Sequence, residues 1–486
     1  MQDRSSSDEW VWPAWLGLFG SLFGFAIALL VFGDHFAWER RLVDIPALAL
    51  AGGLAAAGVV YAALFFLIPW TIGATPAKPR ALLTLVLLSG LGLRLIMLPA
   101  MPALEDDFYR YLWDGGVTAS GHNPYRLAPA SVRTELAPPA IRRLAEEGEL
   151  ILDRINHPGL KTIYPPVAQA AFAAAYWIEP WSLRAWRLVC LVGECASLAF
   201  LLLLLSAVGR SSLWVALYWL NPLVIKELMN SAHMEAIVMP FVLAALLLLV
   251  RCRPILATVS LGLAVGTKLW PVLLLPLVLR PLLTAPFRLA AALAIFIVMV
   301  AIWAAPPWFG GLGSDSGFVA YATLWQTNSA LFQLLQSIAQ FALRGFDLAE
   351  AAPGVLVRVA AAANVAGLAV WLVRQPATEP EVIICRAAMI VLALLLLSPA
   401  QFPWYASWLL VFAPFLPLAL HAGLTVFLPL YYVAFHLMGI NQYTSLNPWL
   451  VWLQWLPIWS LLLVDARCAW RRPMVVDLTL HNPRQI

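Results

Sequence analysis

The residues with the clearest chemical potential lie in one short stretch, Leu104-Glu-Asp-Asp-Phe-Tyr-Arg-Tyr-Leu-Trp-Asp-Gly115, which directly follows a long apolar run. A carboxylate placed there can remove the proton of an acceptor hydroxyl, and a nearby cation can stabilise a departing anion. If the stretch is helical, four of its side chains share one face: Asp107, Arg110, Tyr111 and Asp114. Asp107 and Asp114 would then lie roughly 10 Å apart, with room for a small polar substrate between them. The alternative is an amphipathic helix at a membrane interface whose charges only face water.

The composition of the whole chain indicates a membrane protein. Of its 486 residues 62% are apolar and only 12% are charged, whereas a soluble chain carries roughly 25% charged residues. Apolar runs near the roughly 20-residue length that spans a bilayer recur from Val11 almost to Asp465. The sequence therefore predicts an all-α, polytopic integral membrane protein in a lipid bilayer and excludes a soluble domain of any size. The net charge of +4 is small and the basic residues lie in short connectors, so no nucleic-acid partner is expected.

The apolar runs and the polar inserts between them predict the domain organisation. Roughly 13 or 14 transmembrane helices are expected. Residues 1–79 would form an extra N-terminal transmembrane hairpin, residues 80–465 the main membrane module, and residues 466–486 a cytoplasmic tail. Within the module, residues 101–182 would form a large extracytoplasmic loop with interfacial helices, and residues 305–350 a second loop on the same side.

The distribution of basic residues predicts the orientation. The connector Lys78-Pro-Arg80 is basic, and the positive-inside rule places it in the cytoplasm. Both termini would then lie in the cytoplasm, and the acidic stretch would lie on the extracytoplasmic side of the inner membrane, where no nucleotide pool is available. The N-terminal polar segment lacks the basic region and cleavage site of a signal peptide, so the first apolar run is expected to remain as an anchor.

Three shorter apolar segments need separate treatment. A helix over residues 166–178 is only about 18 Å long, too short for a hydrocarbon core of about 30 Å, so we place it in the outer interface. Residues 254–280 lie between basic connectors and must enter and leave on the same side, as two spans or as a re-entrant pair. Residues 404–419 are expected to be one of the later spans.

Three further polar sets are expected on the same side as the acidic stretch. They are residues 221–235, Lys268 at the tip of the segment 254–280, and the proline-broken helix end 398–405. In the first set, Glu227, Asn230 and Ser231 would share one helical face. Each set also has a structural interpretation: polar helix ends that bond one another, a snorkelling lysine and an aromatic interface anchor. Together they predict a cavity suited to transfer from a lipid phosphate ester, with Arg110, Lys268 or His233 stabilising the departing phosphate.

Four motifs in this order after a membrane span resemble the GT-C superfamily of glycosyltransferases. They are Asp106-Asp-Phe-Tyr-Arg-Tyr-Leu-Trp-Asp-Gly115, Gly121-His-Asn-Pro-Tyr125, Thr162-Ile-Tyr-Pro-Pro166 with Gln169, and Asn221-Pro222 followed by Glu227 and His233-Met-Glu235. Within the superfamily the chain looks closest to bacterial mannosyltransferases that use polyprenol-phosphate-mannose. Aminoarabinose transferases and protein O-mannosyltransferases look like more distant relatives. The similarity covers roughly Arg80 to the last span.

The resemblance implies an inverting transfer of a single mannose-like sugar from a polyprenyl phosphate to a lipid, glycan or protein acceptor on the extracytoplasmic face. In the family the catalytic acid precedes the Arg-Tyr pair, and here both Asp106 and Asp107 stand at that position. We favour Asp107 because it shares a helical face with Arg110 and Asp114, and Asp106 remains the alternative. The motifs and polar sets together give the expected substrate-binding residues: Arg110, Tyr111, Asp114, Asn123, Tyr125, Tyr164, Gln169, Glu227, His233, Glu235, Lys268 and Tyr405.

The chain departs from the family pattern at two places. Gly115-Gly116 stand where many relatives carry Gly-Arg, and Gln401 stands where a histidine is common. Some members of the superfamily use a divalent metal and others do not. The acids here lack the spacing of a recognisable metal motif, so neither a metal nor another cofactor is expected.

Two other functions suit a chain of this class. A multi-span transporter or lipid flippase would use buried charges to line a pathway, but it favours charges near mid-membrane and paired broken helices. Here the polar sets are expected at one face, and there is no convincing internal repeat. An assembly scaffold without catalysis is the third possibility.

Overall fold

The structure, a computed structural model, describes most of the chain: residues 4–74, 79–135, 137–346, 352–376 and 379–471. Over these residues it is helical and has one isolated bridge, between Thr327 and Ala400, so the all-α prediction is confirmed. The Lys78 end of the predicted basic connector, residues 472–486 of the predicted tail and the end of the predicted second loop lie outside the described residues.

Nine helical segments of the described chain are long and apolar enough to cross a membrane. They are formed by α1 (Arg4–Val31), α2 (Ala47–Ala62) with α3 (Leu64–Ala74), α4 (Pro79–Met97), α9 (Leu183–Ala207), α15 (Pro286–Gly310), α18 (Ala352–Arg374), α19 (Pro380–Leu397), α21 (Ala419–Phe427) through η9 (Leu428–Tyr432) to α22 (Val433–Gly439), and α23 (Tyr443–Arg471). A tenth is possible if Pro222–Asn230 and α12 (Glu235–Val250), which are bent by 119°, count as one span. The chain is thus a multi-pass membrane protein, but the predicted 13 or 14 spans are too many.

The count is lower because several apolar runs are broken inside the bundle. The predicted span 404–419 contains only the short turns η8 (Pro403–Ala406) and α20 (Ser407–Leu410). The segment 254–280 divides into α13 (Pro254–Thr267), η6 (Trp270–Leu274) and α14 (Leu275–Leu279). Residues 403–415 are all buried. Irregular backbone is tolerated at membrane depth where protein covers it, and hydropathy alone does not reveal that cover.

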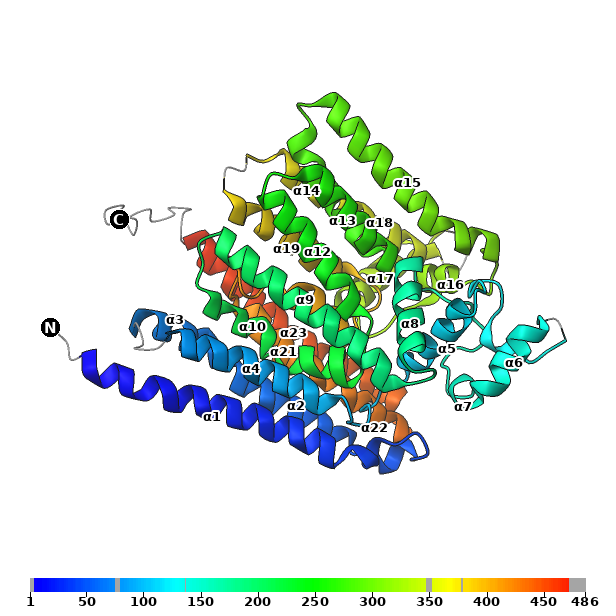
Figure 1. Cartoon of the computed structure of the whole chain (residues 1–486), viewed down its shortest axis with the longest axis horizontal. Coiled ribbons are helices and arrows are strands. Elements are labelled where there is room, and N and C mark those ends of the chain that lie inside the picture. The colour runs from blue at the N-terminus through cyan, green and yellow to red at the C-terminus, as the bar shows by residue number, and fades with distance from the viewer. Residues whose placement is uncertain (1–3, 75–78, 136, 347–351, 377–378, 472–486) are drawn as a thin grey trace.

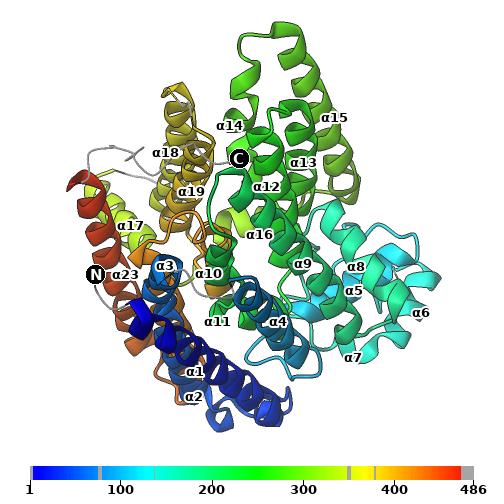
Figure 2. The same ribbon diagram turned by 60° about the vertical axis from the view of Figure 1, so that its left-hand side comes forward.

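The helices of the first large loop gather at one end of the bundle. These are α5 (Asp107–Ala119), α6 (Pro139–Glu147), α7 (Glu149–Leu152) and α8 (Pro166–Ile178). They lie together at the right in Figure 1, whereas the start of α1 and the end of α23 lie at the left; Figure 2 shows the same separation after rotation. The helix α8 has the bounds predicted for it and is not among the candidate spans.

The close packing of α5 on α8 explains the glycine pair that departs from the family pattern. A Cβ atom on Gly115 would lie 2.5 Å from the carbonyl oxygen of Phe172, and one on Gly116 would lie 2.6 Å from the ring of Trp181. A side chain on Gly115 would push α5 and α8 apart, and one on Gly116 would displace Trp181, which follows α8. The pair therefore serves the contact that fixes the acidic helix.

The connector after α1 is tied to the same end of the bundle. It contains η1 (Gly33–Phe36) and η2 (Leu42–Asp44). The ring of Trp38 packs edge-on against Tyr109 of α5, with ring centroids 5.7 Å apart, and Glu39 forms an ion pair with Arg154 at 2.7 Å. The N-terminal hairpin therefore holds one wall of the region around the acidic stretch.

Candidate active site

The three acids at the start of α5 form a compact cluster. Glu105 precedes the helix, and its Oε1 accepts hydrogen bonds from the backbone N–H groups of Asp106 (3.2 Å) and Asp107 (3.3 Å). A carboxylate is favourable at this end of a helix, where the first N–H groups have no partner within the helix. Because Glu105 satisfies these donors, the side chains of the two aspartates remain available for other contacts.

Asn156 holds the two aspartates together. Its Nδ2 donates to Oδ1 of Asp106 (2.8 Å) and to Oδ1 of Asp107 (2.7 Å). Asn156 lies in a turn some fifty residues further along the chain, and no motif pointed to it. The structure thus adds a residue that orients both candidate bases.

Burial changes the protonation of this cluster. It raises the pKa of Asp107 to about 7 and that of Asp106 to about 6, and the neighbouring carboxylate of Glu105 raises both further. Burial also raises the pKa of Glu105 to about 7, opposed by the ammonium of Lys226. Three carboxylates this close do not all ionise easily at neutral pH. A base with a pKa near the working pH is well suited to general-base catalysis.

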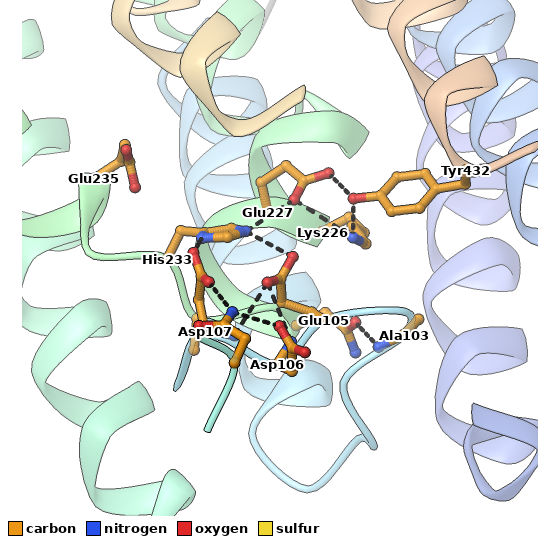
Figure 3. A network of polar contacts seen from close by, with 12 residues as sticks. Ala103, Glu105, Asp106, Asp107, Lys226, Glu227, His233, Glu235 and Tyr432 are labelled. Atoms are coloured by element: carbon orange, nitrogen blue, oxygen red, sulfur yellow. Dashed lines mark hydrogen bonds and ion pairs between the residues drawn. The ribbon is translucent and has the colours of Figure 1, made fainter. Parts of the chain in front are cut away.

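A second group of polar side chains, from His233 to Tyr432, lies next to the three acids (Figure 3). The Nε2 of His233 is 3.0 Å from Oε2 of Glu105, and its Nδ1 is 3.9 Å from Oδ2 of Asp107. The imidazole stacks on Trp404, with ring centroids 3.9 Å apart. Glu227 lies 3.6 Å from Nε2 of His233 and accepts a hydrogen bond from the hydroxyl of Tyr432 at 2.6 Å.

The helical face predicted for Glu227, Asn230 and Ser231 does not form. Residues Lys226–Asn230 make a π-helical turn, η5, and Ala232 has a positive φ of 59°. Asn230 turns away from Glu227 and bonds the backbone just before the acids, at the N–H of Ala103 and the carbonyl of Met101, both at 2.9 Å. A π-helical turn changes the spacing of side chains, so a count based on the α-helical period was wrong here.

Three of these side chains could hold a divalent cation. One ligand atom each from Glu105, Asp107 and His233 lies within 4.8 Å of the others. Nδ1 of His233 is buried and, among the described residues, has no hydrogen-bond partner. Carboxylate and imidazole ligands suit several transition metals. The ammonium of Lys226 lies 3.4 Å from Glu227, and its positive charge also acts on Glu105, one of the three possible ligands.

A cavity of about 1260 Å³ opens beside the acids. Eight predicted site residues line it: Asp106, Asp107, Arg110, Tyr111, Tyr164, Glu235, Lys268 and Tyr405. Six others do not: Asp114, Asn123, Tyr125, Gln169, Glu227 and His233. The structure thus brings the acids of α5 and Lys268 to one cavity and places the six other residues around its walls.

The space predicted between Asp107 and Asp114 is filled by protein. Nε of Arg110 pairs with Oδ1 of Asp114 at 3.3 Å, and Arg110 also donates to the carbonyl of Leu160. Oδ2 of Asp114 accepts from Gln169 at 3.2 Å. Arg110, Asp114 and Gln169 are buried, so this face of α5 does not face water and the interpretation as a simple interfacial helix is wrong.

The loop motif with Asn123 and Tyr125 fastens the wall of the cavity. Nδ2 of Asn123 donates to the carbonyl of Pro306 in α15 at 2.9 Å, and the hydroxyl of Tyr125 donates to the carbonyl of Tyr164 at 2.6 Å. These contacts connect three distant segments of the chain. Tyr125 thus contacts Tyr164, which lines the cavity, whereas Asn123 contacts α15, and neither of the two lines the cavity itself.

The ammonium of Lys268 has protein partners, whereas the ammonium of a snorkelling lysine would extend into water. Lys268 follows α13 and forms an ion pair with Glu235 at the start of α12. Its ammonium lies 4.5 Å from the ring centroid of Tyr405 and 4.9 Å from that of Trp408, distances at which cation–π attraction is effective. The hydroxyls of Tyr405 and Tyr321 are 2.9 Å apart, which fixes the Tyr405 ring.

The side chain of Gln401 bonds the backbone at the end of α19 and does not line the cavity. Its Nε2 donates to the carbonyls of Leu395 (2.8 Å) and Leu396 (2.9 Å) at the end of α19. Its backbone N–H bonds to Thr327 at 2.9 Å, within the isolated bridge. The residue therefore closes a helix end where the family pattern commonly has a histidine.

With this geometry in place, the comparison with known families is decisive for the class of protein. A sequence profile of the alpha-(1->6)-mannopyranosyltransferase N-terminal domain matches residues 14–285, which is more than half of the 486 residues. The chain belongs to this family. It is therefore a membrane-embedded mannosyltransferase of the GT-C class, which takes a sugar donor and an acceptor. No curated protein and no solved structure matches the chain.

The family match covers the first part of this mannosyltransferase and leaves the last part unmatched. It begins inside α1, so the N-terminal hairpin lies within the family domain, and it includes the acids of α5 and Lys268. It ends before α15, so the cavity walls contributed by α18, α19 and α22 lie beyond the matched residues.

Proposed function

We propose that this mannosyltransferase transfers a single mannosyl group, with inversion, from a polyprenyl monophosphate to a lipid, glycan or protein acceptor. The reaction would take place on the extracytoplasmic face of the inner membrane. The observation that carries the proposal is the shared cavity: Asp106, Asp107 and Lys268 all line it, so a base and a cation can reach one substrate.

The chemistry assigns a role to each group. Asp107 removes the proton of the acceptor hydroxyl, with Asp106 as the alternative base. The hydroxyl oxygen attacks the anomeric carbon as the bond from that carbon to the phosphate oxygen breaks. The electron pair of that bond leaves with the polyprenyl phosphate, whose growing negative charge Lys268 stabilises. The proton remains on the aspartate until water removes it.

The family description suggests the product. An alpha-(1->6) linkage forms when the attacking hydroxyl is the primary hydroxyl at position 6 of an acceptor mannose. Inversion then requires that the donor carries its mannose in the β configuration. The aromatic faces of Tyr111, Tyr164 and Tyr405, which line the cavity, are suited to packing against sugar rings.

The rim of the cavity supports a lipid-linked donor. Several lining side chains are large, apolar and exposed: Leu42, Leu269, Leu324 and Met438. Exposed apolar surface next to a polar site suits a substrate with a sugar phosphate at one end and a hydrocarbon chain at the other. The sequence also lacks a glycine-rich phosphate loop of the GxGxxG or GxxxxGK[ST] type, which a nucleotide-binding site would favour.

The experiment that tests this function supplies two donors to the purified full-length protein in nanodiscs. One is mannose on a polyprenyl phosphate, and the other is mannose on a nucleoside diphosphate. We expect transfer to an oligomannoside acceptor from the lipid donor only, with an α linkage in the product. Transfer from the nucleotide donor alone would contradict the proposal. Movement of lipid between leaflets without formation of a glycosidic bond would favour the flippase alternative.

A further inference from the structure

The cations that line the cavity differ in how they are neutralised. Their full set is Arg40, Arg110, Lys161, Lys268 and Arg358. Three of them face a carboxylate within 4 Å: Arg110 faces Asp114, Lys161 faces Asp315 at 2.9 Å, and Lys268 faces Glu235. Within the described part of the chain, Arg40 and Arg358 have no such partner, and of these two only Arg358 is partly buried.

Arg358 lies two turns into α18, a helix that qualifies as a membrane span. Its Nη2 donates to the carbonyl of Trp325 at 2.8 Å, and its guanidinium carbon lies 5.3 Å from the ring centroid of Phe332. A charge in such a helix is costly and usually has a partner or a function. The described residues supply a carbonyl and an aromatic ring but no carboxylate, so the positive charge remains available to a ligand.

A short series of contacts links Arg358 to the acids. Arg358 bonds the carbonyl of Trp325, and the Trp325 ring lies 4.6 Å from the ring of His157. The residue just before His157 is Asn156, whose side-chain amide donates hydrogen bonds to both Asp106 and Asp107. Trp325, His157 and Asn156 all line the cavity, so the guanidinium and the candidate bases face the same space.

An apolar track leads along α18 away from Arg358. Ala361, Ala362 and Val365 follow at intervals of three and four residues, so they share its face of the helix, and all three line the cavity. The track extends about 10 Å from Arg358 to Val365. Leu394 and Leu397 of α19 and Leu273 of η6 line the cavity beside it. The small side chains at 361 and 362 leave space, and Ala362 is exposed.

We propose that Arg358 binds the phosphate of the polyprenyl donor and that the track along α18 holds the first isoprene units of its chain. This inference rests on the proposed function, which it deepens by placing the donor. An inverting displacement requires the base and the departing phosphate on opposite sides of the anomeric carbon, and the cavity that Arg358 shares with Asp106 and Asp107 is where both would act.

The charge balance of the reaction explains why Lys268 alone is insufficient. The donor is a phosphodiester with one negative charge, and the polyprenyl phosphate that departs is a monoester with up to two. Lys268 is already paired with Glu235, so it adds little net positive charge to the cavity. A guanidinium can donate two parallel hydrogen bonds to a phosphate, which gives orientation as well as charge. Arg358 can supply this through its remaining N–H groups.

The test uses farnesyl phosphate, which has the isoprenoid chain and the phosphate but no sugar, and compares it with farnesol and inorganic phosphate. Binding to the full-length protein in nanodiscs is measured directly and as inhibition of mannosyl transfer. We expect wild-type protein to bind farnesyl phosphate at least tenfold more tightly than farnesol, and inorganic phosphate weakly. Arg358→Gln should weaken binding of farnesyl phosphate about 10- to 100-fold and leave farnesol unchanged, since charge-assisted hydrogen bonds are lost.

Two further variants make the result specific. Ala362→Phe fills the track but keeps the guanidinium, so it should weaken farnesyl phosphate and farnesol alike. Arg374→Gln removes an exposed arginine at the far end of the same helix, outside the cavity, and should bind both as the wild type does. In Arg358→Gln the donor KM should rise, because the phosphate is bound less tightly, and kcat should also fall, because the charge of the departing phosphate is less stabilised.

The inference is overturned if wild-type protein does not distinguish farnesyl phosphate from farnesol. It is also overturned if a folded Arg358→Gln variant keeps its affinity within twofold. If that variant does not fold, Arg358→Lys and the wild-type comparison decide, because the latter needs no substitution. In each case, continued transfer from the lipid donor by wild-type protein leaves the proposed function intact, so the two failures can be told apart.

Discussion

Asn156 donates a hydrogen bond of 2.7 Å to Oδ1 of Asp107, and through the same nitrogen it also reaches Asp106. The carboxylates that start α5 are therefore positioned by a turn that precedes α8. That turn lies in the chain between α5 and α8, which pack closely against each other at Gly115. The geometry of the candidate base thus depends on the tertiary structure of the whole first loop.

Replacement of the base gives the first prediction. Asp107→Asn keeps the shape of the side chain and its contact with Asn156 but removes the proton acceptor, so mannosyl transfer should fall by about 10²- to 10⁴-fold. Asp106→Asn should have the smaller effect. Transfer rates are measured on protein whose thermal unfolding and elution profile match the wild type. Asp153→Asn, at a half-exposed aspartate of the same loop, is the matched control. Substantial transfer by both Asp107→Asn and Asp106→Asn would refute the assignment.

The pH profile gives the second prediction. The base must be ionised to accept a proton, and the pKa of Asp107 is raised to about 7 and that of Asp106 to about 6. Transfer should therefore increase with pH through the range of about 6 to 7, level off above it, and fall about tenfold per pH unit well below it. The measurement is kcat/KM from pH 5 to 9 with saturating acceptor. A profile that is flat down to pH 5 would exclude both aspartates as the base.

The third prediction concerns Asn156. Its hydrogen bonds stabilise the ionised form of both aspartates and so lower the pKa of each. Asn156→Ala removes them, so the midpoint of the pH profile should move to higher pH and the rate at pH 7 should fall. Asn364→Ala, at an exposed asparagine of α18, is the control and should leave the midpoint where it is. A lower rate with an unchanged midpoint would mean that Asn156 has a structural role only.

The fold class and the location of the chemistry could be predicted from the sequence, because both depend on local patterns. The apolar runs gave the helical membrane class, and the run of acids before Phe108 identified the segment that lines the cavity. The exclusion of the helix Pro166–Ile178 from the membrane spans followed from its length alone. The number of spans did not, since buried segments such as 404–419 can be apolar without being helical.

The contacts within the site were harder to predict from the sequence, because they join segments far apart in the chain. Asn156 and Arg358 carry no motif, and their importance comes from what they face. Helical spacing placed Arg110 and Asp114 on one face of α5, but it did not reveal that they pair with each other and are buried, so the predicted gap on α5 was wrong. The π-helical turn at Lys226–Asn230 likewise cannot be read from the period of an apolar pattern.

Metal dependence gives the fourth prediction. Glu105, Asp107 and His233 are close enough to bind a cation, but His233 already bonds Glu105 directly, and Lys226 brings positive charge to the cluster. We expect transfer to continue after exhaustive treatment with a chelator, with no stimulation by added Mg²⁺, Mn²⁺ or Zn²⁺. If chelation abolishes transfer and one cation restores it, these three residues become the metal site. His233→Ala should then lose that restoration.

The pair of Lys268 and Glu235 gives the last prediction, because stability and catalysis should respond to it differently. Glu235 is buried and Lys268 is about one-fifth exposed. Lys268→Met leaves a buried carboxylate without its partner, which should lower the free energy of unfolding by about 1–3 kcal/mol after allowance for that partial exposure. Adding Glu235→Gln removes the orphaned charge and should recover most of the loss.

Transfer should not recover in the same way. If Lys268 stabilises the departing phosphate, the double variant regains its thermal stability but stays at least about tenfold slower than the wild type. The control is the exposed pair of Arg133 and Asp153, 2.7 Å apart, whose double replacement by glutamine and asparagine should change neither property. If stability and transfer recover together in the Lys268 and Glu235 double variant, the lysine is a structural partner of α12, and the phosphate is left to Arg358 alone.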